Sequence, residues 1–192
     1  MTVAQATRRS FHATALGLLL GAAAPAIKAA PTVVAPERLK TYVLVHGAWY
    51  GGWCWDKVAQ SLRAQGHTVT TPTCPGVGEL AHLLSREISL TTYITSITNH
   101  ILYQGISDVI LVGSGFAGVV ISGVADRIPH LIHSLVYVDG MVLASGQSVF
   151  EAQPAAITRK RQEQVLTLGK GMAIPAPPVN DYGKLDSETL AW

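Results

Sequence analysis

Cysteine and charge are both scarce in this chain. Cys54 and Cys74 are the only cysteines among 192 residues, which excludes a disulfide-rich framework, and their spacing is not that of a metal site. Charged residues make up 14% of the chain and hydrophobic residues 48%, which excludes a disordered composition and is typical of a globular domain. In an oxidising compartment the two thiols could pair, but two separate buried thiols are the favoured prediction.

Basic side chains are also few outside the first 30 residues. Of the 14 Lys and Arg residues, three lie in residues 1–30, which leaves 11 basic against 12 acidic side chains in the rest. No basic surface for a nucleic acid is therefore predicted.

Sequence signatures of cofactor sites were not identified. We find no glycine-rich dinucleotide loop with its downstream acidic residue, no P-loop, and no metal-ligand pair of the H-x-x-x-H or C-x-x-C type. His130 and His133 lie three residues apart, which alone is weak evidence for a metal. The prediction is that the chain uses neither a nucleotide cofactor nor a metal.

Residues 1–30 have the features of an export signal. Arg8 and Arg9 precede an apolar run over residues 13–26, and small residues that fit a cleavage site follow. The paired arginines favour the twin-arginine route and predict a periplasmic or secreted protein. The run is too short and too rich in Ala and Gly for a stable membrane span. The alternative is an N-terminal amphipathic or anchoring helix.

Short apolar segments alternate with helical segments after residue 40. Strands are predicted over 42–45, 67–71, 108–112 and 134–138, and helices over 55–65, 89–104, 117–128 and within 150–168. This alternation predicts an α/β fold, a parallel sheet with helices on both faces. Because ligands bind at the carboxyl ends of such strands, the loops that follow them are expected to meet at one site.

The segment DVILVGSGFAG, residues 108–118, has the layout of a nucleophile elbow: a strand, a sharp turn of small residues and a helix. The G-x-S-x-G pattern would place serine at position 115, where the chain has Gly115. Ser114 stands one residue early. It is either an atypical nucleophile or, as favoured, a small residue that fits a tight turn, because no histidine activates it. A positive φ is expected at Gly115, where glycine relieves backbone strain.

Four segments together resemble one group of the α/β-hydrolase superfamily. They are YVLVHGAWYGGWCW, GHTVTTPTCPGVGELAHLLS, the elbow segment, and GVADRIPHLIHSLVYVDGMVLASGQSV. The group contains bacterial esterase-like proteins, methyl esterases of the salicylate-binding type and hydroxynitrile lyases. The resemblance implies an α/β-hydrolase core over residues 31–148 and the start of a helical cap over 149–192, so that the fold is C-terminally incomplete at Trp192.

The resemblance also assigns site residues. It implies that the backbone N–H groups of Ala48 and Phe116 form an oxyanion hole, with His46 and Gly47 shaping the loop. Losing one such donor typically costs about 3 kcal/mol of transition-state stabilisation. As alternatives, His46 is a general base or, as favoured, a structural residue that orients this loop. The nearby aromatic residues either line an apolar substrate pocket, Trp49 and Tyr50 above all, or pack the first helix on the sheet.

The catalytic triad implied by the resemblance is not complete. The expected order is Ser, then Asp or Glu, then His, and the last histidine is His133, ahead of the fourth strand. Asp139 follows that strand and is either a catalytic carboxylate or, as favoured, a turn residue before Gly140.

Three hypotheses about the function follow from this incomplete triad. One is a protein related to carboxylic-ester hydrolases with little or no activity. Another is a non-catalytic binder of small apolar or aromatic ester-like molecules, or a truncated pseudoenzyme. The last is an active esterase that uses Ser114. An incomplete sheet edge further predicts self-association.

Overall fold

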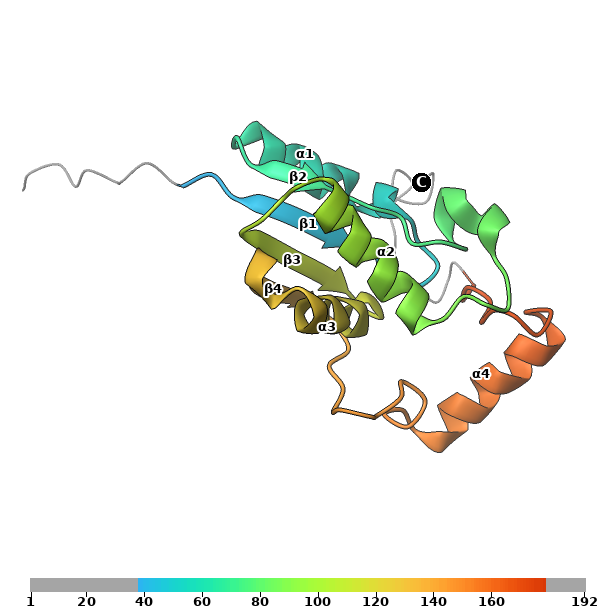
Figure 1. Ribbon diagram of the computed structural model, residues 1–192. Helices are drawn as coiled ribbons and strands as arrows, with labels where there is room; N and C mark the ends of the chain where they lie inside the picture. Colours follow the sequence, from blue (N-terminus) through green and yellow to red (C-terminus); the bar gives the residue numbers. More distant parts are fainter. Residues whose placement is uncertain (1–37, 179–192) are drawn as a thin grey trace, which may run out of the picture. The chain divides into compact units, whose positions relative to one another are not determined.

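The computed structural model describes residues 38–178, which form a four-stranded parallel sheet in the order β2-β1-β3-β4 (Figure 1). The strands are β1 (Thr41–Val45), β2 (Thr68–Thr70), β3 (Val109–Ser114) and β4 (Ile132–Val138). In the register, Val43 pairs with Leu111 across β1 and β3, and Leu111 pairs with Leu135 across β3 and β4. The predicted α/β fold class and its parallel sheet are confirmed.

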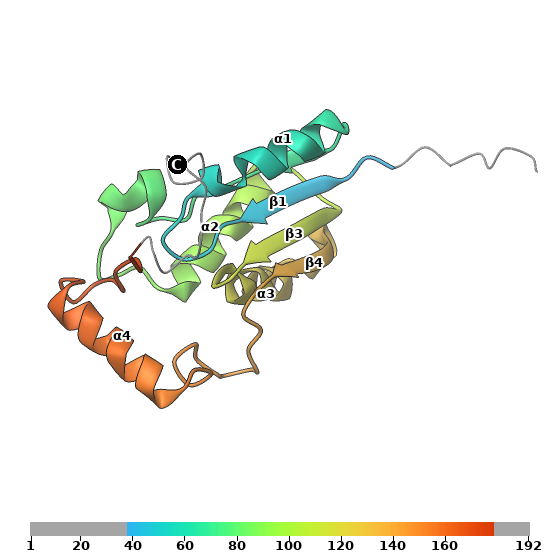
Figure 2. The ribbon, with the colours of Figure 1, turned by 180° about the vertical axis from the view of Figure 1, so that it is seen from behind.

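Helices cover both faces of this sheet (Figures 1 and 2). The α-helices are α1 (Asp56–Ala64), α2 (Leu90–Tyr103), α3 (Ala117–Arg127) and α4 (Ala155–Thr167). Three short 3-10 helices, η1 (Gly52–Trp55), η2 (Gly78–Leu83) and η3 (Pro129–Leu131), were not expected from the sequence. None of the helices within residues 38–178 has the length and apolar character that crossing a bilayer requires.

Two apolar clusters follow from the alternation of side chains along the strands. Val43, Leu111 and the buried side chains of α2 and α3 form the larger cluster on one face. Leu44 and Val112, one residue further along each strand, pack with Ala59 of α1 on the other face. A sheet buried on both faces needs near-continuous apolar strands, which is what β1 and β3 have.

Local chemistry sets the helix ends close to the predicted positions. Ser89 caps α2, where its hydroxyl accepts from the N–H of Thr92 and the Thr92 hydroxyl accepts from the N–H of Ser89. The third strand runs from Val109 to Ser114 rather than from 108 to 112, because Asp108 is exposed and adopts a φ of +54°. The segment 150–168 contains one helix, α4, none of whose residues is buried.

Candidate functional site

The turn between β3 and α3 stands at the carboxyl edge of the sheet. Gly115 adopts a φ of +54°, the positive value expected for an elbow. Its N–H donates to the Val138 carbonyl at 3.1 Å, and its carbonyl accepts from the N–H of Met141 at 2.9 Å. These two bonds fix the turn to the end of β4.

Gly115 leaves open space where a nucleophile side chain would stand. A Cβ placed on this residue would meet no atom within 4 Å. A non-glycine residue there would therefore suffer backbone strain, on the order of 1–3 kcal/mol, and no steric clash.

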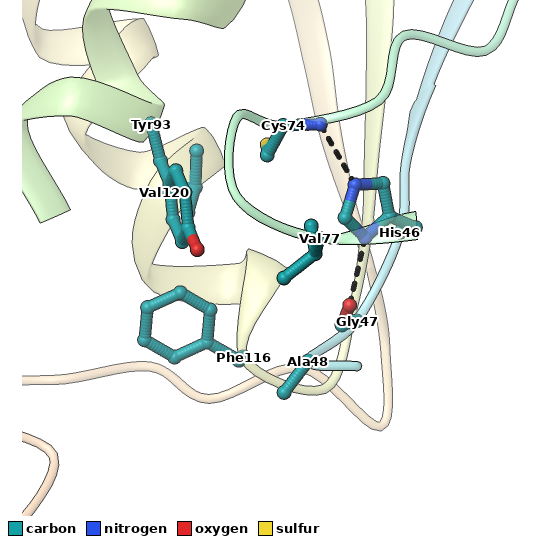
Figure 3. A pocket seen from close by; sticks show the side chains of 8 residues that line it. All are labelled: His46, Gly47, Ala48, Cys74, Val77, Tyr93, Phe116 and Val120. Carbon is teal, nitrogen blue, oxygen red and sulfur yellow. Dashed lines mark hydrogen bonds between the residues drawn. The ribbon is translucent and has the colours of Figure 1, made fainter. Parts of the chain in front are cut away.

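The loop after β1 passes directly beside this turn. A Cβ on Gly47 would lie 3.2 Å from the carbonyl oxygen of Ser114, so glycine is what allows the close approach. Ala48 and Phe116 then line the same small cavity (Figure 3). Neither backbone N–H has a hydrogen-bond acceptor among residues 38–178. Two such donors beside an open position are able to bind a carbonyl oxygen.

His46 holds the loop in this conformation through both ring nitrogens (Figure 3). Its Nε2 accepts from the N–H of Cys74 at 2.9 Å, so the ring proton is on Nδ1, which donates to the Gly47 carbonyl at 2.8 Å. In a planar trans peptide the N–H points opposite to the C=O, so the Ala48 N–H is aimed away from His46.

The environment of His46 also keeps its ring neutral. Burial lowers the pKa of His46, and only 4% of the residue is exposed. With both nitrogens engaged, the side chain has no free lone pair for a general base. The geometry supports the favoured structural interpretation of His46.

A second connection joins the loops after β1 and β2. The Thr73 hydroxyl accepts from the N–H of Gly52 at 2.7 Å and donates to the Glu79 carboxylate at 2.5 Å. This hydrogen bond from Thr73 lowers the pKa of Glu79. No sequence signal marks Thr73 or Glu79, because neither residue type at that spacing forms a motif.

Ser114 faces the opposite side of the sheet from the small cavity. It follows Ile110 and Val112 in the alternation of β3, on the face covered by α1. There it lines an open hollow of about 310 Å³ with Gly47, Tyr50, Cys54, Trp55 and Val138. The lining contains no histidine, so no base for the Ser114 hydroxyl is present in this hollow.

Sequence comparison identifies the lineage of this arrangement. The family model described as "Alpha/beta hydrolase family" matches residues 42–189. The chain belongs to this family. The match includes the loop after β1, the elbow and α4.

Several relatives of this alpha/beta hydrolase are esterases. A carbendazim-hydrolysing esterase from Nocardioides sp. (strain SG-4G) is 47% identical over 119 residues, which cover 62% of this chain and 49% of the relative. Methyl jasmonate esterase 1 of Vitis vinifera is 36% identical over 104 residues, 53% of this chain and 40% of the relative. The chain thus spans about half the length or less of these curated relatives.

Solved structures agree with this assignment. An extracellular α/β-hydrolase from a Paenibacillus species, described as sharing structural and functional homology with tobacco salicylic acid binding protein 2, matches with a TM-score of 0.63. It is 32% identical, and the match covers 68% of this chain and 52% of that one. The chain is therefore related to carboxylic-ester hydrolases.

The remaining candidates lie apart from the small cavity of this hydrolase. Asp139 is exposed with a φ of +49°, a conformation that Asp tolerates in turns. His133 pairs with Asp108 at 2.9 Å, but Asp108 precedes β3, so this pair stands at the amino edge of the sheet. Trp49 donates its indole N–H to the Ile174 carbonyl at 2.8 Å, which ties the loop after β1 to the segment after α4.

Both cysteines are free thiols. Burial raises the pKa of Cys54 to about 11 and that of Cys74 to about 12, so neither thiol is ionised near neutral pH. The favoured prediction of two separate thiols is confirmed, but its expectation that both are buried holds only for Cys74, since Cys54 is half-buried. In residues 38–178, no three His, Cys, Asp or Glu side chains are grouped as a metal site requires.

The turn after β3 does have the G-x-G-x-x-G spacing of dinucleotide loops, in Gly113, Gly115 and Gly118, contrary to the expectation from the sequence. In those loops the helix N-terminus must stay open for a pyrophosphate. Here a Cβ on Gly118 would lie 2.4 Å from the Met141 carbonyl oxygen and 2.6 Å from its nitrogen. The chain after β4 therefore packs against the first turn of α3.

Proposed function

We propose that this chain binds the carbonyl group of a small apolar or aromatic ester-like molecule and has little or no hydrolytic activity of its own. The observation that carries the proposal is the pair of free N–H groups of Ala48 and Phe116 beside Gly115, which has no nucleophile. The donors bind the ligand oxygen, and Gly115 offers no hydroxyl to attack the carbonyl carbon.

The relatives support the ligand class. They are a carbendazim-hydrolysing esterase, a methyl jasmonate esterase and a plant methylesterase, and an esterase acts on the carbonyl group of an ester. The two N–H donors described above lie in the part of the chain that the family model matches.

The glycine at the nucleophile position, Gly115, supports the proposal of low hydrolytic activity. Losing the serine of a serine hydrolase lowers kcat by about a millionfold, and the oxyanion donors alone retain about a thousandfold over water. The alternative, catalysis by Ser114, requires a base within hydrogen-bond reach, and the hollow around Ser114 contains no histidine.

Ester turnover and ligand binding by the purified chain test the two parts of this proposal. No turnover of p-nitrophenyl acetate above a protein control is expected, and turnover that Ser114→Ala abolishes would overturn the inactive assignment. For binding, Gly115→Asn fills the open space beside the donors and should weaken phenyl acetate binding at least tenfold.

A matched control variant separates the effect of the new Asn side chain at position 115 from the effect of backbone strain. Gly105 has a φ of +62° and equally open surroundings, but it follows α2 at the other edge of the sheet. Gly105→Asn should leave phenyl acetate binding unchanged. Equal losses in both variants would contradict a ligand site at Gly115.

We also propose that the protein is exported by the twin-arginine route. Residues 1–30, which carry the signal-like pattern, lie outside the described residues. Fusion of these residues to a reporter should direct it to the periplasm, and replacing Arg8 and Arg9 with lysine should stop transport. Transport that the replacement leaves intact would overturn the route.

A further inference from the structure

A small cavity adjoins the two N–H donors on the side of α2 and α3 (Figure 3). Its volume is about 20 Å³, and a cavity of about 10–15 Å³ already holds one water molecule. It therefore has room for one methyl-sized group. Its lining includes Ala48, Cys74, Val77, Tyr93, Phe116 and Val120.

We propose that this cavity receives one substituent of the bound carbonyl group, limits it to about the size of a methyl or methoxy group, and hydrogen-bonds it through Tyr93. This assignment rests on the proposed function, because the same ligand carbonyl occupies the N–H groups of Ala48 and Phe116.

Most side chains that line the cavity are apolar. The side chains of Val77, Val120 and Phe116 contribute only carbon atoms. Cys74 is buried, and its pKa of about 12 keeps the thiol uncharged near neutral pH. His46 also borders the cavity, but both of its ring nitrogens are occupied by Cys74 and Gly47. A charged substituent would lose its hydration here without gaining a partner.

Tyr93 supplies the one uncommitted polar side-chain atom of this wall. Its hydroxyl has no hydrogen-bond partner among residues 38–178, and Figure 3 shows it directed toward the space beside Phe116 and Val77. Burial raises the pKa of Tyr93, so the hydroxyl keeps its proton and is able to donate. A methoxy or carbonyl oxygen on the ligand would satisfy it.

The position of Tyr93 is fixed from two sides. Its ring stacks edge-on against Phe116, with centroids 6.0 Å apart and an interplanar angle of 80°. Its backbone lies in the first turn of α2, where its N–H donates to the Ser89 carbonyl at 3.3 Å. The hydroxyl is thus preorganised, so a ligand need not order it on binding.

Two ligand series test the size limit. Phenyl acetate, propanoate and butanoate lengthen the acyl side of an ester, whereas methyl, ethyl and propyl benzoate lengthen the alkoxy side. If the cavity accepts one substituent, affinity should fall about tenfold or more per added methylene in one series and stay level in the other. Equal behaviour of the two series would overturn the assignment.

Three variants test the residues. Val120→Ala enlarges the cavity and should restore at least tenfold affinity for the propyl or butanoyl member of the discriminating series. Tyr93→Phe should keep the size limit and weaken the smallest ligand about two- to tenfold. Val124→Ala is the matched control, because Val124 is also fully buried on α3 but does not line the cavity. It should leave the selectivity unchanged.

The outcomes separate this assignment from the proposed function. Esters that bind without size discrimination, or with discrimination that Val120→Ala leaves unchanged, overturn the cavity assignment alone. Absence of binding by every ester to both the wild type and Val120→Ala overturns the proposed function, and the cavity assignment falls with it.

Discussion

Replacing His46 with phenylalanine is expected to lower the free energy of unfolding by about 3 kcal/mol. Phenylalanine keeps a planar aromatic ring at this position but removes both ring nitrogens, so the hydrogen bonds are lost. The buried N–H of Cys74 loses its acceptor, which costs about 1–3 kcal/mol, and the bond to the Gly47 carbonyl contributes about 0.5–1.5 kcal/mol.

Two further replacements of His46 separate these bonds. Asparagine places an amide nitrogen near the position of Nδ1, so it can keep the bond to Gly47 while losing the bond from Cys74. Glutamine reaches the position of Nε2, so it can accept from Cys74 while losing the bond to Gly47. Asparagine should therefore destabilise the fold more, and glutamine should disturb ligand binding more, because the Gly47 carbonyl orients the Ala48 N–H.

The assay is urea unfolding at pH 8 and over a pH series. The pKa of His46 is lowered in the folded state, so the unfolded chain binds the proton first as the pH falls. Stability is therefore complete above the unfolded pKa of about 6.5 and is lost as the pH falls from there toward the folded pKa. The pKa of His100 is also lowered by burial, so both the wild type and the His46→Gln variant should lose stability with acid. The wild type should lose it more steeply, because it has His46 as well.

His100→Phe is the control for this experiment. His100 is only half-buried, and its Nε2 forms a hydrogen bond of 3.0 Å with the Thr70 hydroxyl, which water is able to replace. Its loss should cost about 1 kcal/mol or less. A His46→Phe variant no less stable than His100→Phe would refute the argument that the two bonds of His46 fix the loop.

Two further predictions concern helix α3 and the edge of the sheet at β4. Gly118→Ala should destabilise the fold, because displacing the Met141 backbone costs about 1–3 kcal/mol against a gain of about 1 kcal/mol in helix propensity. Gly123→Ala on the same helix meets only side-chain atoms of Ile94 and no distant backbone, so urea unfolding should show a smaller loss for it than for Gly118→Ala. We also propose that the chain self-associates through β4, which pairs only with β3 among residues 38–178 and exposes 41% of Val136 and 43% of Val138. Val136→Glu should shift the light-scattering mass toward the monomer, and a wild-type chain that is already monomeric would contradict this.

Much of the fold follows from local patterns in the sequence. The apolar runs of β1 and β3 and the helical spacing of α2 predict the alternation of strands and helices, and hence a parallel sheet covered on both faces. The errors lie where local signals are weak. Asp108 was assigned to a strand that its positive φ excludes, and the 3-10 helices η1 and η2 have no periodicity long enough to detect.

The sequence by itself determined the identity of the side chain at the elbow. Gly115 stands where a hydrolase of this family has serine, and no fold can supply a hydroxyl that the chain does not encode. The order of strands and loops likewise determined that the loops after β1 and β3 meet at one edge, because parallel strands end on the same side.

Only the tertiary structure decided where His46, Ser114 and Tyr93 lie. The sequence left His46 as either a base or a structural residue. Its ring nitrogens bond to the N–H of Cys74, 28 residues away, and to the Gly47 carbonyl, which favours the structural interpretation. The alternation of side chains along β3 places Ser114 on the sheet face covered by α1. The packing of α2 against α3 brings Tyr93 to the cavity. These outcomes depend on contacts between residues distant in the chain, which local patterns do not contain.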